Sequence, residues 1–198
     1  MCYVFIFKNR DDFHVQINQL VGNHFIDSFF FYITYLGDGW FAIPILLVTF
    51  FINIRLGIYL TLSFIIATLL ANFLKWNVFG DHFRPYWIYQ YQNPYQVKKV
   101  EGVDLMIYRS FPSGHATQAF AIFFACALVA IKKYYKFIFI SIALLASFSR
   151  VYLAQHWLAD ITAGSVIGVF FALLFYFTFY NKQILNNLNK PLLQLFKN

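Results

Sequence analysis

Long apolar stretches dominate this chain of 198 residues and limit what it can fold into. A helix needs about 20 apolar residues to cross the hydrocarbon core of a bilayer. Only 12% of the residues are charged, whereas soluble domains average about 25%. We therefore predict an all-α, integral-membrane helical bundle with five clear spans. The predicted spans are Trp40–Ile54, Leu56–Leu74, His115–Ile131, Phe137–Leu153 and Leu158–Tyr180.

The N-terminal part of the chain is harder to assign. The first span is short, and it either extends into Phe25–Tyr35 or leaves that segment as an interfacial helix. Residues 1–7 are apolar but too short to cross a bilayer, and they do not resemble a cleavable signal peptide. We interpret them as the tail of a missing or truncated sixth span. The whole of residues 1–198 is expected to form a single membrane domain.

Basic residues in the short connections predict the orientation of the bundle. The positive-inside rule makes the face that carries most of them, together with the C-terminus, cytoplasmic. The basic residues on this face are Arg55, Lys132, Lys133, Lys136, Lys182, Lys190 and Lys197. Lys98, Lys99 and Arg109 fall on the other face and weaken the bias. The net charge of +7 includes no long basic run on a soluble segment, so no nucleic-acid partner is expected.

Three polar clusters fall on the opposite, extracytoplasmic face. They comprise Lys75 with Arg84-Pro85, then Pro112–His115, then Ser149-Arg150 with His156 and Asp160. Ionisable groups at the ends of membrane spans are costly and are therefore functional candidates. Alternation of the spans brings all three clusters to one membrane surface, although they lie far apart in the chain.

The last cluster combines a histidine and a carboxylate at helical spacing. His156 and Asp160 are four residues apart, so the carboxylate can accept the imidazole Nδ1–H and leave Nε2 as a nucleophile. Arg150 offers a planar guanidinium for phosphate oxygens. Taken alone, each has an ordinary alternative, because polar pairs at helix ends and interfacial arginine anchors are common.

The middle cluster precedes an apolar helix. Ser113 can cap that helix or donate its hydroxyl to an anion, and Gly114 lets an oxyanion approach the backbone. Free N–H groups at a helix N-terminus bind phosphate. His115 lies where it could protonate a leaving oxygen. The alternative is an ordinary helix cap next to an interfacial histidine.

The first cluster adds two cations. Lys75 and Arg84 could neutralise a phosphate dianion, or they could be an interfacial anchor and a residue before a turn proline. Two other features are structural or unassigned. Gly164 and Gly168 lie four residues apart in the last span and predict close helix packing. The segment Gly37–Trp40 is assigned no chemistry.

Together the clusters resemble the signature of the type 2 phosphatidic acid phosphatase superfamily, which includes bacterial lipid phosphatases and vanadium-dependent haloperoxidases. The second and third clusters match the family pattern. The first departs from it, because eight residues rather than six separate Lys75 from Arg84. The resemblance covers a motif-bearing core over residues 75–160.

The resemblance implies a metal-independent phosphatase domain that needs no cofactor and works through a phosphohistidine. In this scheme His156 attacks phosphorus, Asp160 orients it and His115 protonates the leaving group. The residues expected to hold the phosphate oxygens are Lys75, Arg84, Ser113, Gly114 and Arg150.

The expected substrate is a membrane lipid phosphate, for example undecaprenyl diphosphate, a lipid A phosphate, phosphatidylglycerophosphate or phosphatidate. The expected location is the bacterial cytoplasmic membrane, with the lipid bilayer as the surrounding partner. A vanadate-dependent haloperoxidase is one alternative, because the same cradle can hold vanadate. A non-catalytic, anion-binding membrane protein is the other. The sequence does not indicate an oligomeric state.

Overall fold

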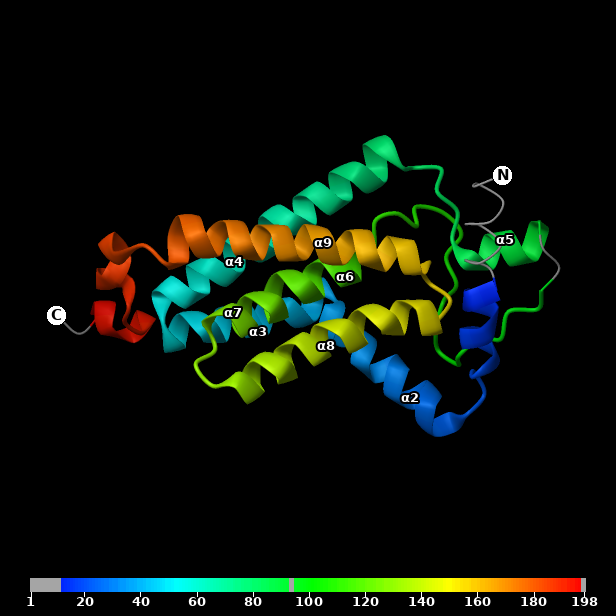
Figure 1. Cartoon of the computed structure of the whole chain (residues 1–198), viewed down its shortest axis with the longest axis horizontal. Helices are drawn as coiled ribbons and strands as arrows, with labels where there is room; N and C mark the ends of the chain where they lie inside the picture. The colour runs from blue at the N-terminus through cyan, green and yellow to red at the C-terminus, as the bar shows by residue number, and fades with distance from the viewer. Residues whose placement is uncertain (1–11, 93–94, 197–198) are drawn as a thin grey trace.

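The computed structural model describes residues 12–92 and 95–196, which contain helices and loops and no strand. Three long helical segments run roughly along the long axis of the molecule (Figure 1). They are α4 (Ile54–Phe73) with its continuation η2 (Leu74–Val78), α8 (Lys133–Tyr152), and α9 (Leu158–Phe175) with its continuation η4 (Tyr176–Tyr180). The all-α prediction is confirmed.

The N-terminal segment contributes a bent pair of helices. A short helix over residues 12–19 precedes α2 (His24–Ile33), and η1 (Thr34–Gly37) leads into α3 (Gly39–Ile52). The chain bends by 56° at the break between η1 and α3. Asp38 sits in this break and caps α3, because its carboxylate accepts a hydrogen bond from the Trp40 N–H at 2.9 Å.

The remaining elements are short. The helix α5 (Pro85–Tyr91) lies in the long connection between the second and third predicted spans, and η5 (Gln183–Leu188) and η6 (Leu192–Phe196) follow the last long helix. Residues 1–11 lie outside the described residues, so the predicted tail of a sixth span is not tested.

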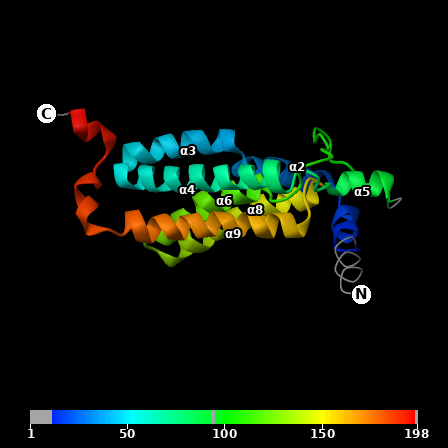
Figure 2. The same cartoon turned by 90° about the horizontal axis from the view of Figure 1, so that it is seen from above.

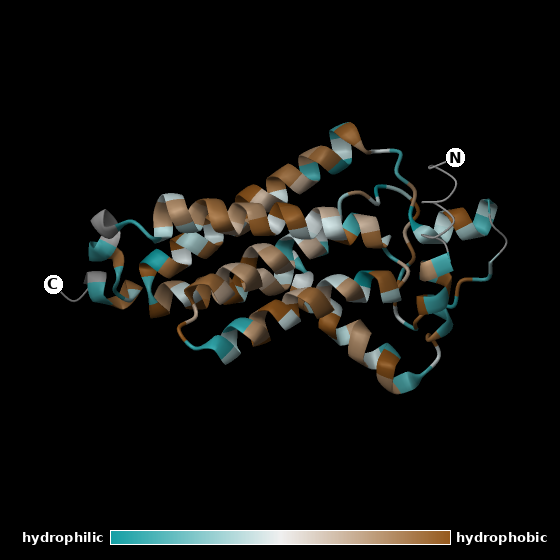
Figure 3. Ribbon diagram, in the orientation of Figure 1, coloured by the Kyte–Doolittle hydropathy of each residue, from teal (hydrophilic) through white to brown (hydrophobic). Residues whose placement is uncertain are grey.

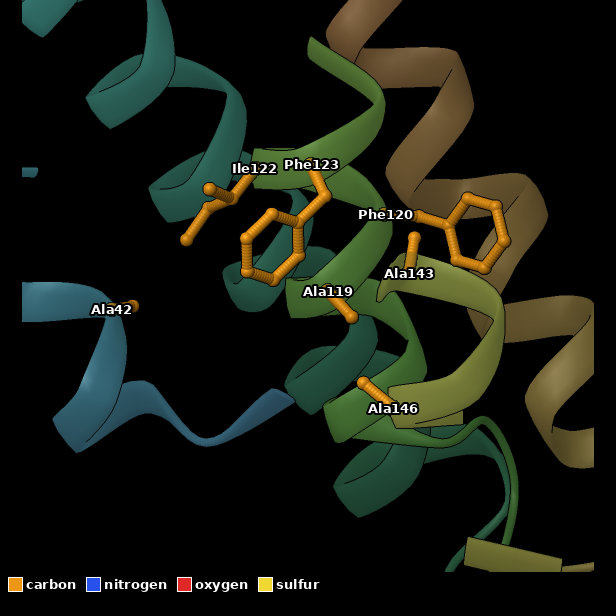
Figure 4. Close-up of a cluster of buried hydrophobic side chains, with 7 residues drawn as sticks. All are labelled: Ala42, Ala119, Phe120, Ile122, Phe123, Ala143 and Ala146. Carbon is orange, nitrogen blue, oxygen red and sulfur yellow. The ribbon is translucent and has the colours of Figure 1, made fainter. Parts of the chain in front are cut away.

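A central helix passes through the middle of the bundle. It consists of α6 (Gly114–Ala119), η3 (Phe120–Phe124) and α7 (Ala125–Val129), and the other long helices surround it (Figures 1 and 2). Small side chains allow these helices to approach closely, with phenylalanines filling the remaining space. The buried cluster drawn in Figure 4 contains Ala42, Ala119, Phe120, Ile122, Phe123, Ala143 and Ala146.

Two glycines of α9 set its distance from the central helix. A Cβ atom at Gly168 would lie 2.6 Å from the Thr117 carbonyl oxygen, and one at Gly164 would lie 3.0 Å from Thr117 Oγ1. Both positions therefore need glycine for the observed packing. This agrees with the close packing predicted from their spacing, and it places the start of α9 directly against the start of α6.

The predicted number of spans is only partly supported. Three helical segments of the described residues are long and apolar enough to cross a membrane, namely Ile54–Val78, Lys133–Tyr152 and Leu158–Tyr180. The bent pair His24–Gly37 and Gly39–Ile52 makes a fourth if it counts as one span. The predicted span His115–Ile131 corresponds to a shorter apolar helix, Gly114–Val129.

Hydrophobic residues predominate along the middle of the bundle, and hydrophilic residues gather towards its two ends (Figure 3). The beginnings of α4 and α8 lie at the end near the C-terminus, while the beginnings of α6 and α9 lie towards the other end (Figure 1). This arrangement agrees with the predicted alternation. The sequence predicts Arg55 to be a basic residue of a short connection at the cytoplasmic face. In the structure it is buried and donates hydrogen bonds to the Lys182 carbonyl and to Asn186 Oδ1.

Candidate active site

The candidate site lies where the beginnings of α6 and α9 meet the end of α8. The Ser113 N–H donates a hydrogen bond to the Asp160 carbonyl at 3.0 Å, which joins the first two elements. The N–H groups of Gln155 and His156 both donate to the Arg150 carbonyl, at 2.9 and 3.1 Å. The turn between α8 and α9 is thereby folded back on itself, so the second and third predicted clusters share one pocket.

A buried group of three side chains holds His156. Asp160 Oδ2 lies 3.3 Å from His156 Nδ1, and the Ser110 hydroxyl lies 3.5 Å from the same nitrogen while donating a hydrogen bond to Asp160. The Trp157 N–H also donates to Asp160 Oδ2, at 2.9 Å. Because Nδ1 faces the carboxylate, the Nδ1–H tautomer is favoured and Nε2 keeps its lone pair.

The surroundings of His156 keep its imidazole neutral. Burial, with only 2% of the residue exposed, lowers the pKa of His156 well below its usual range. The nearby charges of Arg84, Lys75 and Arg150 lower this pKa further. A neutral imidazole surrounded by cations is suited to attack an anionic phosphate ester, because the substrate is attracted while the nucleophile stays unprotonated.

Arg84 is fixed by hydrogen bonds on two sides. Its Nε donates to the Tyr108 carbonyl at 2.9 Å, and one terminal nitrogen donates to the carbonyl and to Oε1 of Gln155, at 2.9 and 3.0 Å. Burial lowers the pKa of Arg84 to about 10, while the charge of Asp160 acts in the opposite direction. The guanidinium therefore remains charged at neutral pH and is held rigidly beside the turn that carries His156.

Arg150 is held from the N-terminal helices. One of its terminal nitrogens donates to Thr34 Oγ1 at 2.9 Å. Its Nε is buried and has no hydrogen-bond partner among the described residues. A buried N–H of a charged group is costly without an acceptor. An anion in the pocket would supply one.

Lys75 and the start of α6 lie against each other. A Cβ atom built at Gly114 would lie 3.8 Å from Lys75 Nζ, so the ammonium approaches the backbone where α6 begins. Lys75 projects from η2, a wider helical turn at the end of α4. Ser113 caps α6, since its hydroxyl oxygen accepts from the Ala116 N–H at 3.4 Å. The unusual spacing between Lys75 and Arg84 therefore still lets both cations reach the pocket.

The structure brings the predicted site residues into one region and adds others that sequence reasoning missed. Ser110 precedes the second cluster by two residues, and Gln155 directly precedes His156. Thr34 comes from the start of η1, and Asp38 from the break between η1 and α3. The segment Gly37–Trp40, whose residue types alone indicate no chemistry, is the signal in the sequence that points to Asp38.

Comparison with known sequences identifies the family. The sequence model of the PAP2 superfamily matches residues 56–184, which is more than half of the chain. The chain belongs to the PAP2 superfamily. The matched segment contains all three motif clusters but not the bent pair α2–α3.

Known relatives and solved structures agree with this assignment. The chain is 33% identical over 123 residues to a lipid A 1-phosphatase of Rhizobium johnstonii, covering 60% of this chain and 46% of that protein. It is 31% identical over 139 residues to an undecaprenyl-diphosphatase of Sulfolobus acidocaldarius, covering 68% of this chain and 61% of the relative. The match thus spans about half to three fifths of the length of these relatives.

The fold is also similar to that of solved PAP2-type proteins. Aquifex aeolicus LpxE superposes with a TM-score of 0.66 at 27% identity, covering 82% of this chain and 92% of that structure. The transmembrane PAP2-type phosphatidylglycerolphosphate phosphatase of Bacillus subtilis superposes with a TM-score of 0.65 at 23% identity, covering 90% and 88%. The apolar helices and this shared fold make the chain an integral membrane protein.

Proposed function

We propose that this protein is a membrane lipid phosphatase that forms a phosphohistidine at His156. The observation that carries the proposal is the environment of this side chain. Its Nδ1 faces Asp160 at 3.3 Å, its pKa is lowered by burial, and cations from three other elements act on it. A neutral, oriented nucleophile inside a cationic pocket is what transfer of a phosphoryl group from an anionic ester requires.

The first half of the reaction follows from these positions. The Nε2 lone pair of His156 forms a bond to phosphorus while the bond from phosphorus to the lipid oxygen breaks. Asp160 stabilises the positive charge that develops on the ring. His115 donates a proton to the departing oxygen, so the lipid leaves as a neutral alcohol or, from a diphosphate, as a monophosphate.

The second half regenerates the enzyme. Water attacks the phosphorus of the phosphohistidine, gives a proton to His115, and displaces Nε2 to release inorganic phosphate. Throughout both steps the charge on the non-bridging oxygens is stabilised by fixed donors. These are the side chains of Lys75, Arg84, Arg150 and Ser113 and the Gly114 N–H.

The substrate class and the sidedness are also part of the proposal. The relatives named above are phosphatases of lipid A and of undecaprenyl diphosphate, which supports a lipid carrying a phosphate or diphosphate. The positive-inside distribution supports a site on the extracytoplasmic face of the cytoplasmic membrane.

The test is phosphate release by purified protein from a panel of lipid phosphates and diphosphates in detergent. We expect turnover of at least one member, loss of that turnover in His156→Ala, and inhibition by vanadate. Because the charge of the phosphate is offset by side chains, EDTA is expected to leave the rate largely unchanged. Wild-type turnover in His156→Ala would disprove the nucleophile assignment, and complete loss with EDTA would indicate a metal mechanism.

A further inference from the structure

The break between α2 and α3 contacts two of the site residues, although it lies outside the three motifs and outside the segment that matches the family. Thr34 accepts a hydrogen bond from Arg150 at 2.9 Å. Asp38 Oδ2 lies 3.9 Å from His115 Nε2. The bend of 56° in this helix pair therefore occurs where the chain reaches the pocket.

Local structure fixes the carboxylate of Asp38. One oxygen, Oδ1, accepts the Trp40 N–H at 2.9 Å and caps α3, which leaves Oδ2 facing His115. The preceding residue, Gly37, permits the approach, because a Cβ atom there would lie 2.9 Å from the His115 carbonyl oxygen. The helix cap and the glycine together determine where the negative charge sits.

Burial, and then the nearby charges of Arg150, Lys75 and Arg84, lower the pKa of His115 well below its usual range. The other charged groups that act on it are cations or a second imidazole. Lys75 comes from η2, Arg84 from the residue before α5, and Arg150 from α8. His156 faces it from the turn before α9. Positive neighbours oppose protonation of an imidazole, whereas a carboxylate favours it. Asp38 supplies the opposing charge.

The separation of 3.9 Å suits a proton donor. It is short enough for a strong charge interaction but too long for a direct hydrogen bond. The charge of Asp38 therefore stabilises a proton on Nε2 without holding it in a direct hydrogen bond to the carboxylate. Both side chains are also partly open to solvent, at 27% for His115 and 33% for Asp38, so the pair can exchange protons with water between turnovers.

We propose that Asp38 is a positioning residue that opposes the neighbouring cations and thereby favours the proton-donating form of His115, which makes the bent helix pair α2–α3 part of the active site. This inference rests on the proposed function. It adds a role for a residue outside the motifs, because the break between η1 and α3 places the Asp38 carboxylate next to His115.

The variant Asp38→Asn tests the inference without removing the helix cap, because asparagine caps helices as well as aspartate does. The measurement is kcat against pH for the lipid phosphate that the wild type hydrolyses fastest in the panel above. We expect the alkaline limb of the profile to move down by about one pH unit, with nearly wild-type kcat on the acidic side. A merely structural defect would lower kcat at every pH.

A second readout uses the leaving group. The anion of p-nitrophenol departs without a proton, so Asp38→Asn is expected to hydrolyse p-nitrophenyl phosphate at close to the wild-type rate while losing about ten-fold on the lipid ester at alkaline pH. The matched control is Glu101→Gln, which removes one exposed carboxylate from the long connection and is expected to leave both profiles unchanged.

The outcomes separate this inference from the proposed function. If the wild type releases phosphate and Asp38→Asn shows an unshifted pH profile, the role of Asp38 is wrong while the phosphatase assignment stands. An equal shift in Glu101→Gln would also overturn it, because the effect would then come from net charge alone. If the wild type releases no phosphate from any member of the panel, the proposed function itself fails.

Discussion

The two histidines of the pocket have a carboxylate each, but in different settings. His156 is 2% exposed, and its Nδ1 lies 3.3 Å from Asp160, which also accepts hydrogen bonds from Ser110 and the Trp157 N–H. His115 is partly exposed, and its Nε2 lies 3.9 Å from Asp38. The pair His156–Asp160 is buried and hydrogen-bonded to its neighbours, while the pair His115–Asp38 is partly exposed to water.

This difference matches the two tasks of the proposed reaction. A nucleophile must stay neutral and oriented, and burial among cations with a bonded Nδ1 achieves both. A proton donor must recharge from solvent after each turnover, which requires access to water. The protein thus fits two identical side chains to different proposed tasks by changing their access to solvent and the geometry of their carboxylates.

The largest expected effects come from alanine substitutions of the two histidines. They differ between substrates whose leaving group needs a proton and substrates whose leaving group does not. His156→Ala should lower kcat by about 1000-fold or more on both the lipid ester and p-nitrophenyl phosphate, because no phosphohistidine can form. In His115→Ala, release of the first equivalent of leaving group should slow comparably only on the lipid ester, whose oxygen needs a proton, because the later attack of water uses His115 with either substrate. Rapid-mixing kinetics of the first turnover on the two substrates measures this, and equal slowing of that first step on both would contradict the assigned roles.

Removing the charge of the buried carboxylate comes next. Asp160→Asn should lower kcat by about 100-fold or more, because the amide can present an N–H to His156 Nδ1 and favour the wrong tautomer. The same substitution at Asp38 is expected to shift the pH profile instead. If Asp160→Asn produced only a shift of the profile, the proposed contrast between the two pairs would be lost.

The two cations of the first motif are expected to differ. Arg84→Ala should lower kcat/KM by about 100-fold and Lys75→Ala by about 10-fold, because Arg84 is pre-organised by its bonds to Tyr108 and Gln155 whereas Lys75 is a flexible point charge. Both variants are measured on the same lipid phosphate. A larger loss in Lys75→Ala would show that the ammonium next to Gly114 carries more of the charge stabilisation.

The buried state of His156 also predicts a pH dependence of stability. The folded pKa lies well below its usual range, so between about pH 6.5 and that value only the unfolded chain binds a proton. The free energy of unfolding should therefore fall as the pH decreases, by up to about 1.4 kcal/mol per pH unit from this group. His156→Gln should show a shallower loss in thermal unfolding between pH 7.5 and 5, and an unchanged slope would contradict the burial argument.

The smallest expected effect comes from removing the hydrogen bond between Thr34 and Arg150. Thr34→Val keeps the shape of the side chain but removes the oxygen that accepts from the guanidinium. We expect KM to rise by about five-fold with no shift of the pH profile. This separates Thr34, which positions a phosphate ligand, from Asp38, which acts on a proton donor. A shifted profile in Thr34→Val would indicate that distortion of the helix break alone explains both variants.

Much of the fold and of the site was predictable from sequence. Apolar length predicts spans over Leu56–Leu74, Phe137–Leu153 and Leu158–Tyr180, because the bilayer requires a minimum helix length. The structure has long apolar helical segments in these places, over Ile54–Val78, Lys133–Tyr152 and Leu158–Tyr180. The same rule predicts a span over His115–Ile131, and there the structure has an apolar helix, Gly114–Val129, that is shorter than the other three segments. The central position of this helix comes from its packing against the surrounding helices, which apolar length does not encode.

The site residues divide in the same way. The pairing of His156 with Asp160 could be predicted from their spacing, although His156 lies in the turn before α9 and not on the helix itself. The contribution of Ser110 could not, because a serine two residues before a motif has no distinctive pattern. The role of Thr34 could not be predicted either, since its hydrogen bond to Arg150 joins residues 116 positions apart in the sequence.

The sequence by itself determined that this chain is helical, belongs in a membrane, and carries its polar clusters towards one end of the bundle, because hydropathy and alternation act along the chain. The tertiary structure alone decided that a carboxylate from outside the three clusters lies in the pocket. The approach of Asp38 to His115 depends on the bend between η1 and α3 and on Gly37, which lets the two backbones come close. These are contacts between distant segments, and no local pattern encodes them.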